Sequence, residues 1–198
     1  MRDPASINVL IGCEESQSVT LEFRKFGINA FSCDLLHCTG WHPEYHLQMD
    51  IFDALHLRKW DFVGLHCPCT HTAVCGNRHY YNSPLRIQGA TFTKKCWFTA
   101  CDVCDRVYLE QPKTIMQRYI GNRSQIIQPF QFGHGETKET WLWLKNLPLL
   151  IPTNTVEGRE QRIWKMGRNL NRRSLRSKTY PGIASAMAEQ WAPLLLNQ

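Results

Sequence analysis

The stretch DFVGLHCPCT, residues 61–70, carries both a strong fold signal and the strongest chemical signal of the chain. Its first half, residues 61–65, contains the short apolar run that is typical of a buried strand in a parallel sheet. Its second half follows at once with a histidine, two cysteines and a proline. Because ligands of open α/β sheets bind beyond the carboxyl ends of the strands, this junction predicts a functional site.

Strand-like and helix-like segments alternate on both sides of this stretch. The expected strands cover residues 7–11, 29–33, a weak run that ends near Asp50, 61–65, 107–109, 125–128 and 149–151. The expected helices cover residues 16–26, 87–104, 137–144 and 183–191. This order and spacing suit right-handed crossovers, and they predict an α/β fold with a Rossmann-like, mostly parallel sheet and helices on both faces. The length of 198 residues suits one catalytic domain over residues 1–198.

Composition excludes several classes of protein. Hydrophobic residues make up 43% of the chain, which is ordinary for a globular domain. No apolar stretch is long enough to cross a membrane, and residues 1–4 lack the apolar core of a signal peptide, so we expect a cytoplasmic protein of a bacterial or phage-infected cell. The nine cysteines are odd in number and lie between Cys13 and Cys104, which favours reduced thiols over a disulfide scaffold.

The positive charge of the chain is local. The formal net charge is +6, yet residues 158–178 alone hold eight Lys or Arg residues and one acidic residue. Such a segment is either a solvated loop or a phosphate-binding surface. If it binds a nucleic acid, its candidate contact residues are Arg168, Arg172, Arg173 and Arg176.

Chemically useful residues follow five expected strands: Gly12 to Ser16, Asp34, Asp50, Cys69 and Glu110. The order of these motifs resembles that of DNA cytosine-5 methyltransferases, especially the compact versions of bacteriophages and prophages. The resemblance implies a methyltransferase-type sheet, S-adenosylmethionine as cofactor and DNA as partner, in DNA methylation and restriction–modification. We expect a monomer that binds no membrane.

The resemblance also assigns roles to individual residues. Cys69, in the pair Pro68-Cys69, matches the nucleophile, and Glu110 matches the glutamate that binds the base. Asp34 matches the ribose-binding acid, and Asp50 matches the acid near the adenine. The remaining residues assigned to the cofactor site are Gly12, Glu14, Ser16, His66 and Pro68, and no metal ligand is expected.

Three features depart from the family pattern. Thr70 stands where the large enzymes have Gln, and Gln111 stands where Asn is usual. The chain also has no room for a sizeable target-recognition domain.

The chemistry explains why these residue types are needed. A cysteine thiolate adds to carbon 6 of cytosine and raises the electron density on carbon 5, which then attacks the methyl group. A glutamate held partly neutral in a dry pocket could share a proton with N3 of the ring. The target base must be flipped out of a duplex or be single-stranded already.

Other interpretations of the same residues stay open. The fold and thiol could methylate RNA or a free pyrimidine nucleotide, or a degraded homologue could bind without turnover. The dense cluster His66, Cys67, Cys69, His71 and Cys75 could instead hold zinc in a non-catalytic nucleic-acid-binding protein. The Cys67–Cys69 spacing is too short for a standard zinc knuckle, which argues against that class.

Overall fold

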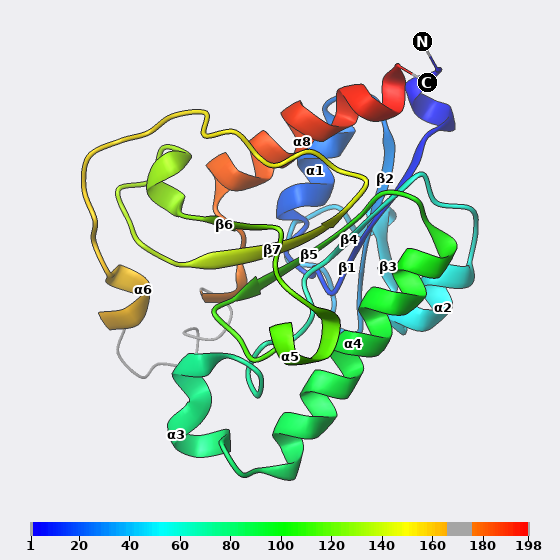
Figure 1. Cartoon of the computed structure of the whole chain (residues 1–198). Helices are drawn as coiled ribbons and strands as arrows, with labels where there is room; N and C mark the ends of the chain where they lie inside the picture. The colour runs from blue at the N-terminus through cyan, green and yellow to red at the C-terminus, as the bar shows by residue number, and fades with distance from the viewer. Residues whose placement is uncertain (1, 166–175, 198) are drawn as a thin grey trace.

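A seven-stranded sheet in the order β3-β2-β1-β4-β5-β7-β6 forms the centre of the molecule (Figure 1). The computed structural model describes residues 2–165 and 176–197. The parallel strands are β1 (Asn8–Gly12), β2 (Asn29–Asp34), β3 (His46–Gln48), β4 (Phe62–Leu65) and β5 (Val107–Pro112). β7 (Thr140–Lys145) runs antiparallel to β5 and to β6 (Gln125–Ile127). The predicted fold class, α/β with a Rossmann-like and mostly parallel sheet, is confirmed.

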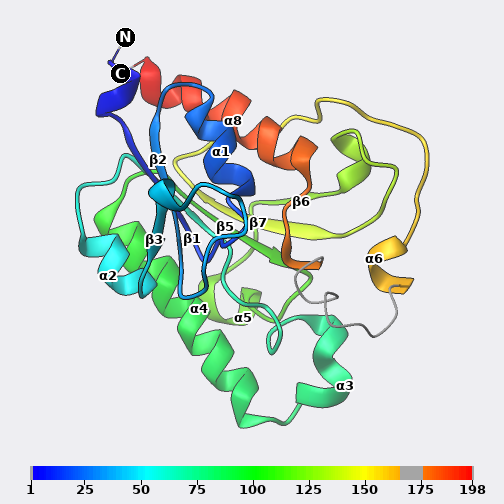
Figure 2. The same ribbon diagram turned by 180° about the vertical axis from the view of Figure 1, so that it is seen from behind.

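Helices cover both faces of this sheet (Figures 1 and 2). α1 (Ser18–Arg24) and α8 (Pro181–Leu196) pack on one face, where they share a core with Phe62 and Tyr108. α2 (Ile51–His56) and α4 (Pro84–Val103) pack on the other face around Leu65 and Leu109. The short helices are α3 (Asn77–Tyr80), α5 (Gln117–Ile120) and α6 (Arg162–Lys165), and 3-10 turns cover Pro4–Ser6, Pro43–Tyr45, Val74–Gly76 and Pro129–Gln131. Near the two ends of the chain, the Arg2 amide donates to the Leu196 carbonyl at 2.8 Å.

One predicted helix is wrong, because residues 137–144 do not form a helix and strand β7 begins at Thr140. The side chains of β7 alternate between the two cores, since Trp141 and Trp143 pack on the α2/α4 side and Leu142 packs on the α1/α8 side. That alternation has the period of two that a strand requires, and it fits a strand buried on both faces.

The expected strand at residues 149–151 is also wrong, because this segment is irregular. Side chains satisfy its backbone in place of a neighbouring strand. The amide group of Gln125 pairs with both backbone polar groups of Leu150, at 2.7 and 2.9 Å. Gln190 does the same for Ile151, at 2.8 Å for each bond.

Within the described ranges, no helix combines the length and the apolar character that crossing a membrane requires.

Candidate active site

The register of the sheet aligns four parallel strands near their carboxyl ends. The residues paired there are Cys33 of β2, Gly12 of β1, Leu65 of β4 and Leu109 of β5. The residues that follow them are Asp34, Cys13, His66 and Glu110. The sheet therefore gathers three of the residues that the sequence predicted, Asp34, His66 and Glu110, along one line.

The loop after β4 holds Cys69 in a tight turn. The Cys69 carbonyl accepts hydrogen bonds from the amides of Thr72 at 3.1 Å and Ala73 at 2.9 Å. The buried side chain of Gln111 donates to the Cys67 carbonyl at 2.5 Å and accepts from the Thr72 hydroxyl at 3.4 Å. Gln111, which departs from the family pattern, thus anchors the loop on both sides of Cys69.

The Cys69 thiol is protonated at neutral pH in this state of the protein. Burial, and then the negative charge of Glu110, raises the pKa of Cys69 to about 11, while the charge of Lys138 acts in the opposite direction. Cys69 and Glu110 are therefore close enough to affect each other, and a nucleophilic role for Cys69 requires a change that favours the thiolate.

Glu110 is ionised, contrary to the expectation of a partly neutral acid. Burial raises the pKa of Glu110, but the hydrogen bond from His66 and the charge of Lys138 together bring it below its ordinary value. Glu110 Oε2 lies 3.4 Å from His66 Nδ1, and the two side chains are only 14% and 7% exposed. Glu110 is shielded from solvent, but the contact with His66 and the charge of Lys138 keep its carboxylate charged.

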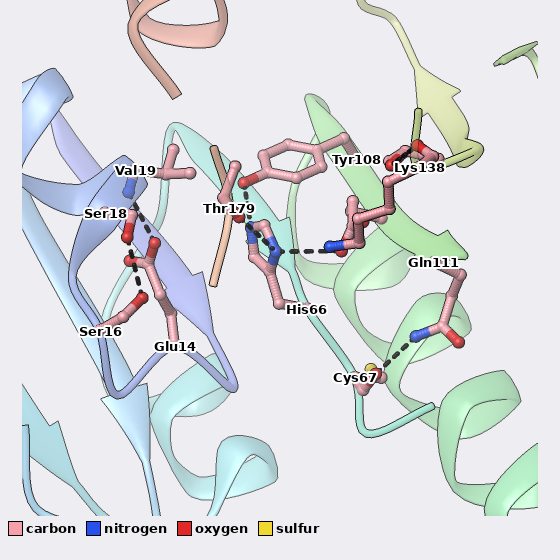
Figure 3. Close-up of polar contacts among 12 residues, drawn as sticks. Glu14, Ser16, Ser18, Val19, His66, Cys67, Tyr108, Gln111, Lys138 and Thr179 are labelled. Atoms are coloured by element: carbon pink, nitrogen blue, oxygen red, sulfur yellow. Dashed lines mark hydrogen bonds and ion pairs between the residues drawn. The ribbon is translucent and has the colours of Figure 1, made fainter. Parts of the chain in front are cut away.

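The ring of His66 contacts protein groups through both of its nitrogens (Figure 3). His66 Nε2 lies 2.7 Å from the Tyr108 hydroxyl, and Nδ1 faces Glu110. Both ring nitrogens of His66 thus contact protein groups, and its amide donates to the Gly12 carbonyl at 2.9 Å. If His66 contacts the cofactor as predicted, it would do so through its backbone carbonyl. Pro68, also assigned to the cofactor, is exposed in the following loop.

The loop after β1 is organised around the buried carboxylate of Glu14 (Figure 3). Glu14 Oε1 accepts from the Val19 amide at 2.6 Å, and Oε2 accepts from the Thr20 amide at 3.2 Å and the Thr20 hydroxyl at 2.7 Å. Ser16, another predicted cofactor residue, lies with its hydroxyl 3.0 Å from that of Ser18. Glu14 therefore caps the first turn of α1, the structural role that a buried acceptor has at a helix start.

Gly12, a predicted cofactor residue, lies against helix α2. A Cβ at Gly12 would lie 2.3 Å from Ile51 Cδ1, so the missing side chain makes room for α2. The backbone turns one residue later, at Cys13, where φ is +59°.

Asp34 and Asp50 each use one carboxylate oxygen locally. Asp34 Oδ1 accepts from the Leu36 amide at 2.9 Å, and Asp50 Oδ1 accepts from the Phe52 amide at 2.8 Å as the N-cap of α2. Among residues 2–165 and 176–197, no hydrogen bond is seen to Oδ2 of either residue. Each of the two carboxylates therefore keeps one acceptor oxygen for a further hydrogen bond.

Only part of the predicted phosphate-binding set is described. Arg168, Arg172 and Arg173 lie outside the described residues. Arg176 lies beside the segment that follows β4, with its Nη2 4.0 Å from Cys75 Sγ. Its carbonyl accepts a bond from Lys138 Nζ at 3.2 Å, so the end of the basic segment contacts the site.

Sequence reasoning missed Lys138, Tyr108 and Glu136. Glu136 joins the site to the basic segment, since it accepts from Arg162 at 2.8 Å and from the Tyr180 hydroxyl at 2.9 Å. The wrong helix at residues 137–144 concealed Lys138. Tyr108 could have been found, because it precedes Glu110 by two residues and so lies on the same face of β5.

In the described part of the chain, no three His, Cys, Asp or Glu side chains are grouped so as to hold a metal ion. All nine cysteines are free thiols.

Comparison with known proteins identifies no family. No family model and no curated protein matches the chain. Among solved structures, the bifunctional kinase-methyltransferase WbdD is similar at a TM-score of 0.41 and 14% identity. The match covers 74% of this chain and 36% of the WbdD chain, so this chain spans about a third of that protein's length. A likeness at this level assigns no activity, and the function has to be inferred from the site.

Proposed function

We propose that this protein transfers a methyl group from S-adenosylmethionine to carbon 5 of cytosine in DNA, with Cys69 as the nucleophile. The observation that carries the proposal is that the loop holding Cys69 follows β4, which pairs in the sheet with β5, the strand that holds Glu110. The charge of Glu110 also contributes to the raised pKa of Cys69. A thiol and a carboxylate are the two groups that activation of carbon 5 requires. The resemblance of the motif order to DNA cytosine-5 methyltransferases adds to this support.

Asp34, Asp50 and the loop of residues 12–16 would hold the cofactor. When bound there, S-adenosylmethionine supplies an electrophilic methyl group next to the nucleophile loop. The Oδ2 atoms of Asp34 and Asp50 can accept hydrogen bonds from hydroxyl or amine groups of the cofactor.

The coupling of the two catalytic groups suggests how Cys69 becomes reactive. The charge of Glu110 contributes to the raised pKa of the Cys69 thiol. The proton of the Cys69 thiol would pass to Glu110, which would share it with N3 of a bound cytosine. Glu110 would then no longer carry its full negative charge, and the Cys69 thiolate would form more easily. Cys69 Sγ would then add to carbon 6, so the nucleophile would be activated only when a base is in place.

A polyanionic substrate is favoured by the basic groups beside the nucleophile loop. Arg176 and Lys138 both contact this region, and residues 158–178 hold the excess positive charge of the chain. The target base would be flipped from a duplex or presented in a single strand, because a stacked base cannot reach Cys69.

Covalent trapping tests this function. The protein is incubated with S-adenosylmethionine and DNA that contains 5-fluorocytosine, and the intact mass is measured. We expect an adduct in the wild type and in the control variant Cys75→Ser, whose thiol is exposed, and none in Cys69→Ser. An adduct that persists in Cys69→Ser would exclude Cys69 as the nucleophile. Parallel reactions with 5-fluorocytosine in RNA and in a free nucleotide identify the substrate class.

A further inference from the structure

A chain of three contacting side chains runs from Tyr108, in the core of the α1/α8 face, through His66 to the proposed catalytic carboxylate of Glu110. We propose that His66 is a positioning residue that fixes the orientation and the charge of Glu110, and that Tyr108 selects the tautomer of His66 that does so. The role in catalysis rests on the proposed function, but the chain of contacts does not.

The contacts are short and shielded from solvent. The Tyr108 hydroxyl lies 2.7 Å from His66 Nε2, and His66 Nδ1 lies 3.4 Å from Glu110 Oε2. The rings of Tyr108 and His66 also meet edge to face, with centroids 5.5 Å apart. Tyr108 is fully buried, so His66 is held from one side by the core and contacts Glu110 on the other.

The proton positions follow from the chemistry of the three groups. Burial, then the charges of Glu14 and Glu110, raises the pKa of Tyr108 well above its ordinary value, so its hydroxyl keeps its proton. That hydroxyl can donate to Nε2 of a neutral imidazole. An imidazole that accepts at Nε2 carries its proton on Nδ1, where it donates to Glu110 Oε2. The Thr179 hydroxyl, 3.5 Å from Nδ1, can accept a share of the same proton.

The sheet is built to admit the Tyr108 ring at this position. A Cβ at Gly64 would lie 2.3 to 2.6 Å from three atoms of Tyr108, including its hydroxyl oxygen. The ring also packs on Trp191 of α8, with centroids 5.3 Å apart. Gly64 and α8 therefore aim the hydroxyl at His66.

This arrangement decides what Glu110 can offer to a base. Because His66 occupies Oε2, Oε1 is the oxygen left to face a substrate. The charged or titratable groups that face the pair are Glu14 from the β1 loop, Lys138 from the segment before β7, and Cys69 from its own loop. Burial raises the pKa of Glu110, and the bond from His66 is the largest contribution that lowers it.

The test measures the titration of Glu110 in the protein alone. The carboxylate infrared band is followed against pH, with Glu110→Gln as the reference that removes it. We expect His66→Ala to raise the pKa of Glu110 by about one pH unit or more, the usual size of such an effect. His66→Gln, whose amide can donate to Oε2, should restore most of the wild-type value. His56→Ala, an exposed histidine at the end of α2, is the matched control.

Two further variants test the role of Tyr108 and guard against a misfolded His66→Ala. Tyr108→Phe should raise the pKa of Glu110 in the same direction by less, and Gly64→Ala should reproduce that change by displacing the ring. The double variant Gly64→Ala/Tyr108→Phe should shift the pKa of Glu110 no further than either single variant, because both substitutions remove the same contact between the Tyr108 hydroxyl and His66. Thermal unfolding reports whether each variant folds. The proposal is overturned if folded His66→Ala and Tyr108→Phe both keep the wild-type pKa of Glu110. His66→Ala and His66→Gln would then show no difference in that pKa.

The outcome is separable from that of the proposed function. The titration needs neither cofactor nor DNA, so a shift in His66→Ala without any covalent adduct would support the positioning role and contradict the methyltransferase. If both hold, His66→Ala should move the acid limb of the pH–rate profile to higher pH, and His66→Gln should return it.

Discussion

At the scale of single residues, the site depends on the mutual effect of Cys69 and Glu110. The same carboxylate that would bind the base also contributes to the raised pKa of the thiol, about 11. Burial and the charge of Glu110 both favour the protonated thiol, which reacts with oxidants more slowly than a thiolate does.

Glu110→Gln should therefore make the Cys69 thiol more reactive toward a small alkylating reagent, while it slows methyl transfer strongly. Removal of the negative charge lowers the pKa of Cys69, so alkylation by iodoacetamide at pH 8 should become faster. Methyl transfer should fall by roughly 10²–10⁴-fold, because the variant cannot pass a proton to N3. Mass spectrometry measures alkylation of Cys69, with Cys75 as the internal control, and an equal rate in both proteins would refute the coupling.

Asp34→Ala should weaken cofactor binding and leave DNA binding intact. Loss of a hydrogen bond to a charged group costs about 1.5–3 kcal/mol, so the Kd for S-adenosylmethionine should rise roughly 10- to 150-fold. Calorimetry gives the affinity, and Asp53→Ala on α2 serves as the acidic control. An unchanged Kd for S-adenosylmethionine would exclude Asp34 from cofactor binding, and its role would then be the local hydrogen bond to the Leu36 amide.

At the scale of elements, α1 depends on an acid that lies outside it. The N-cap position of α1 is Gln17, which has a left-handed φ of +57° and makes no capping bond with its side chain. Glu14 accepts the helix-start hydrogen bonds in its place. The candidate cofactor loop and the α1/α8 layer are therefore connected through one buried carboxylate.

Glu14→Gln should destabilise the protein, because its amide nitrogen cannot accept the bonds from Thr20. A buried donor left unpaired costs about 1–3 kcal/mol, measurable as a lower urea midpoint. Glu22→Gln, which removes an exposed pair with Lys25 on the same helix, should change stability far less.

The pH dependence of the free energy of unfolding should differ between the wild type and Glu14→Gln. Burial raises the pKa of Glu14 in the folded state. Its contribution is therefore present below the unfolded pKa and is lost as the pH rises through the higher folded value. The Gln variant should lack that loss, and equal pH profiles for the two proteins would contradict it.

At the scale of the whole molecule, the excess positive charge is separated from the proposed cofactor site. Residues 158–178 hold the excess positive charge, whereas the strand ends of β1 to β3 carry Glu14, Asp34 and Asp50. DNA and cofactor should therefore bind through different surfaces, and each can be weakened without the other.

Replacement of Arg168, Arg172 and Arg176 by alanine should flatten the salt dependence of DNA binding. Each lost phosphate contact removes about 0.9 from the slope of log K against log salt, so the slope should fall by roughly two to three. Cofactor affinity should not change. The charge-matched control replaces Lys25, Lys59 and Lys94, which are exposed elsewhere on the molecule. A wild-type slope in the arginine variant would favour a free nucleotide as substrate.

Local patterns alone determined the parallel strands of the sheet and the residues that follow them. An apolar run that ends in a polar turn is a property of about ten consecutive residues, as in residues 61–70, and it needs no distant partner to be recognised. For this reason the strands up to β5 and helices α1, α4 and α8 could be predicted. The strand ends were less accurate, because Asp34 is the last residue of β2 and Glu110 lies inside β5, which continues to Pro112.

Only the tertiary structure decided which groups meet. β7 is a strand because β5 and β6 flank it, and residues 149–151 are not one because Gln125 and Gln190 satisfy their backbone. The contact of His66 with Tyr108 joins residues 42 apart in the sequence, and that of Lys138 with Arg176 joins residues 38 apart. Such contacts depend on how the strands are ordered in the sheet. The charge of Glu110 and the pKa of Cys69 follow from them, because both are set by burial and by neighbours that no local window contains.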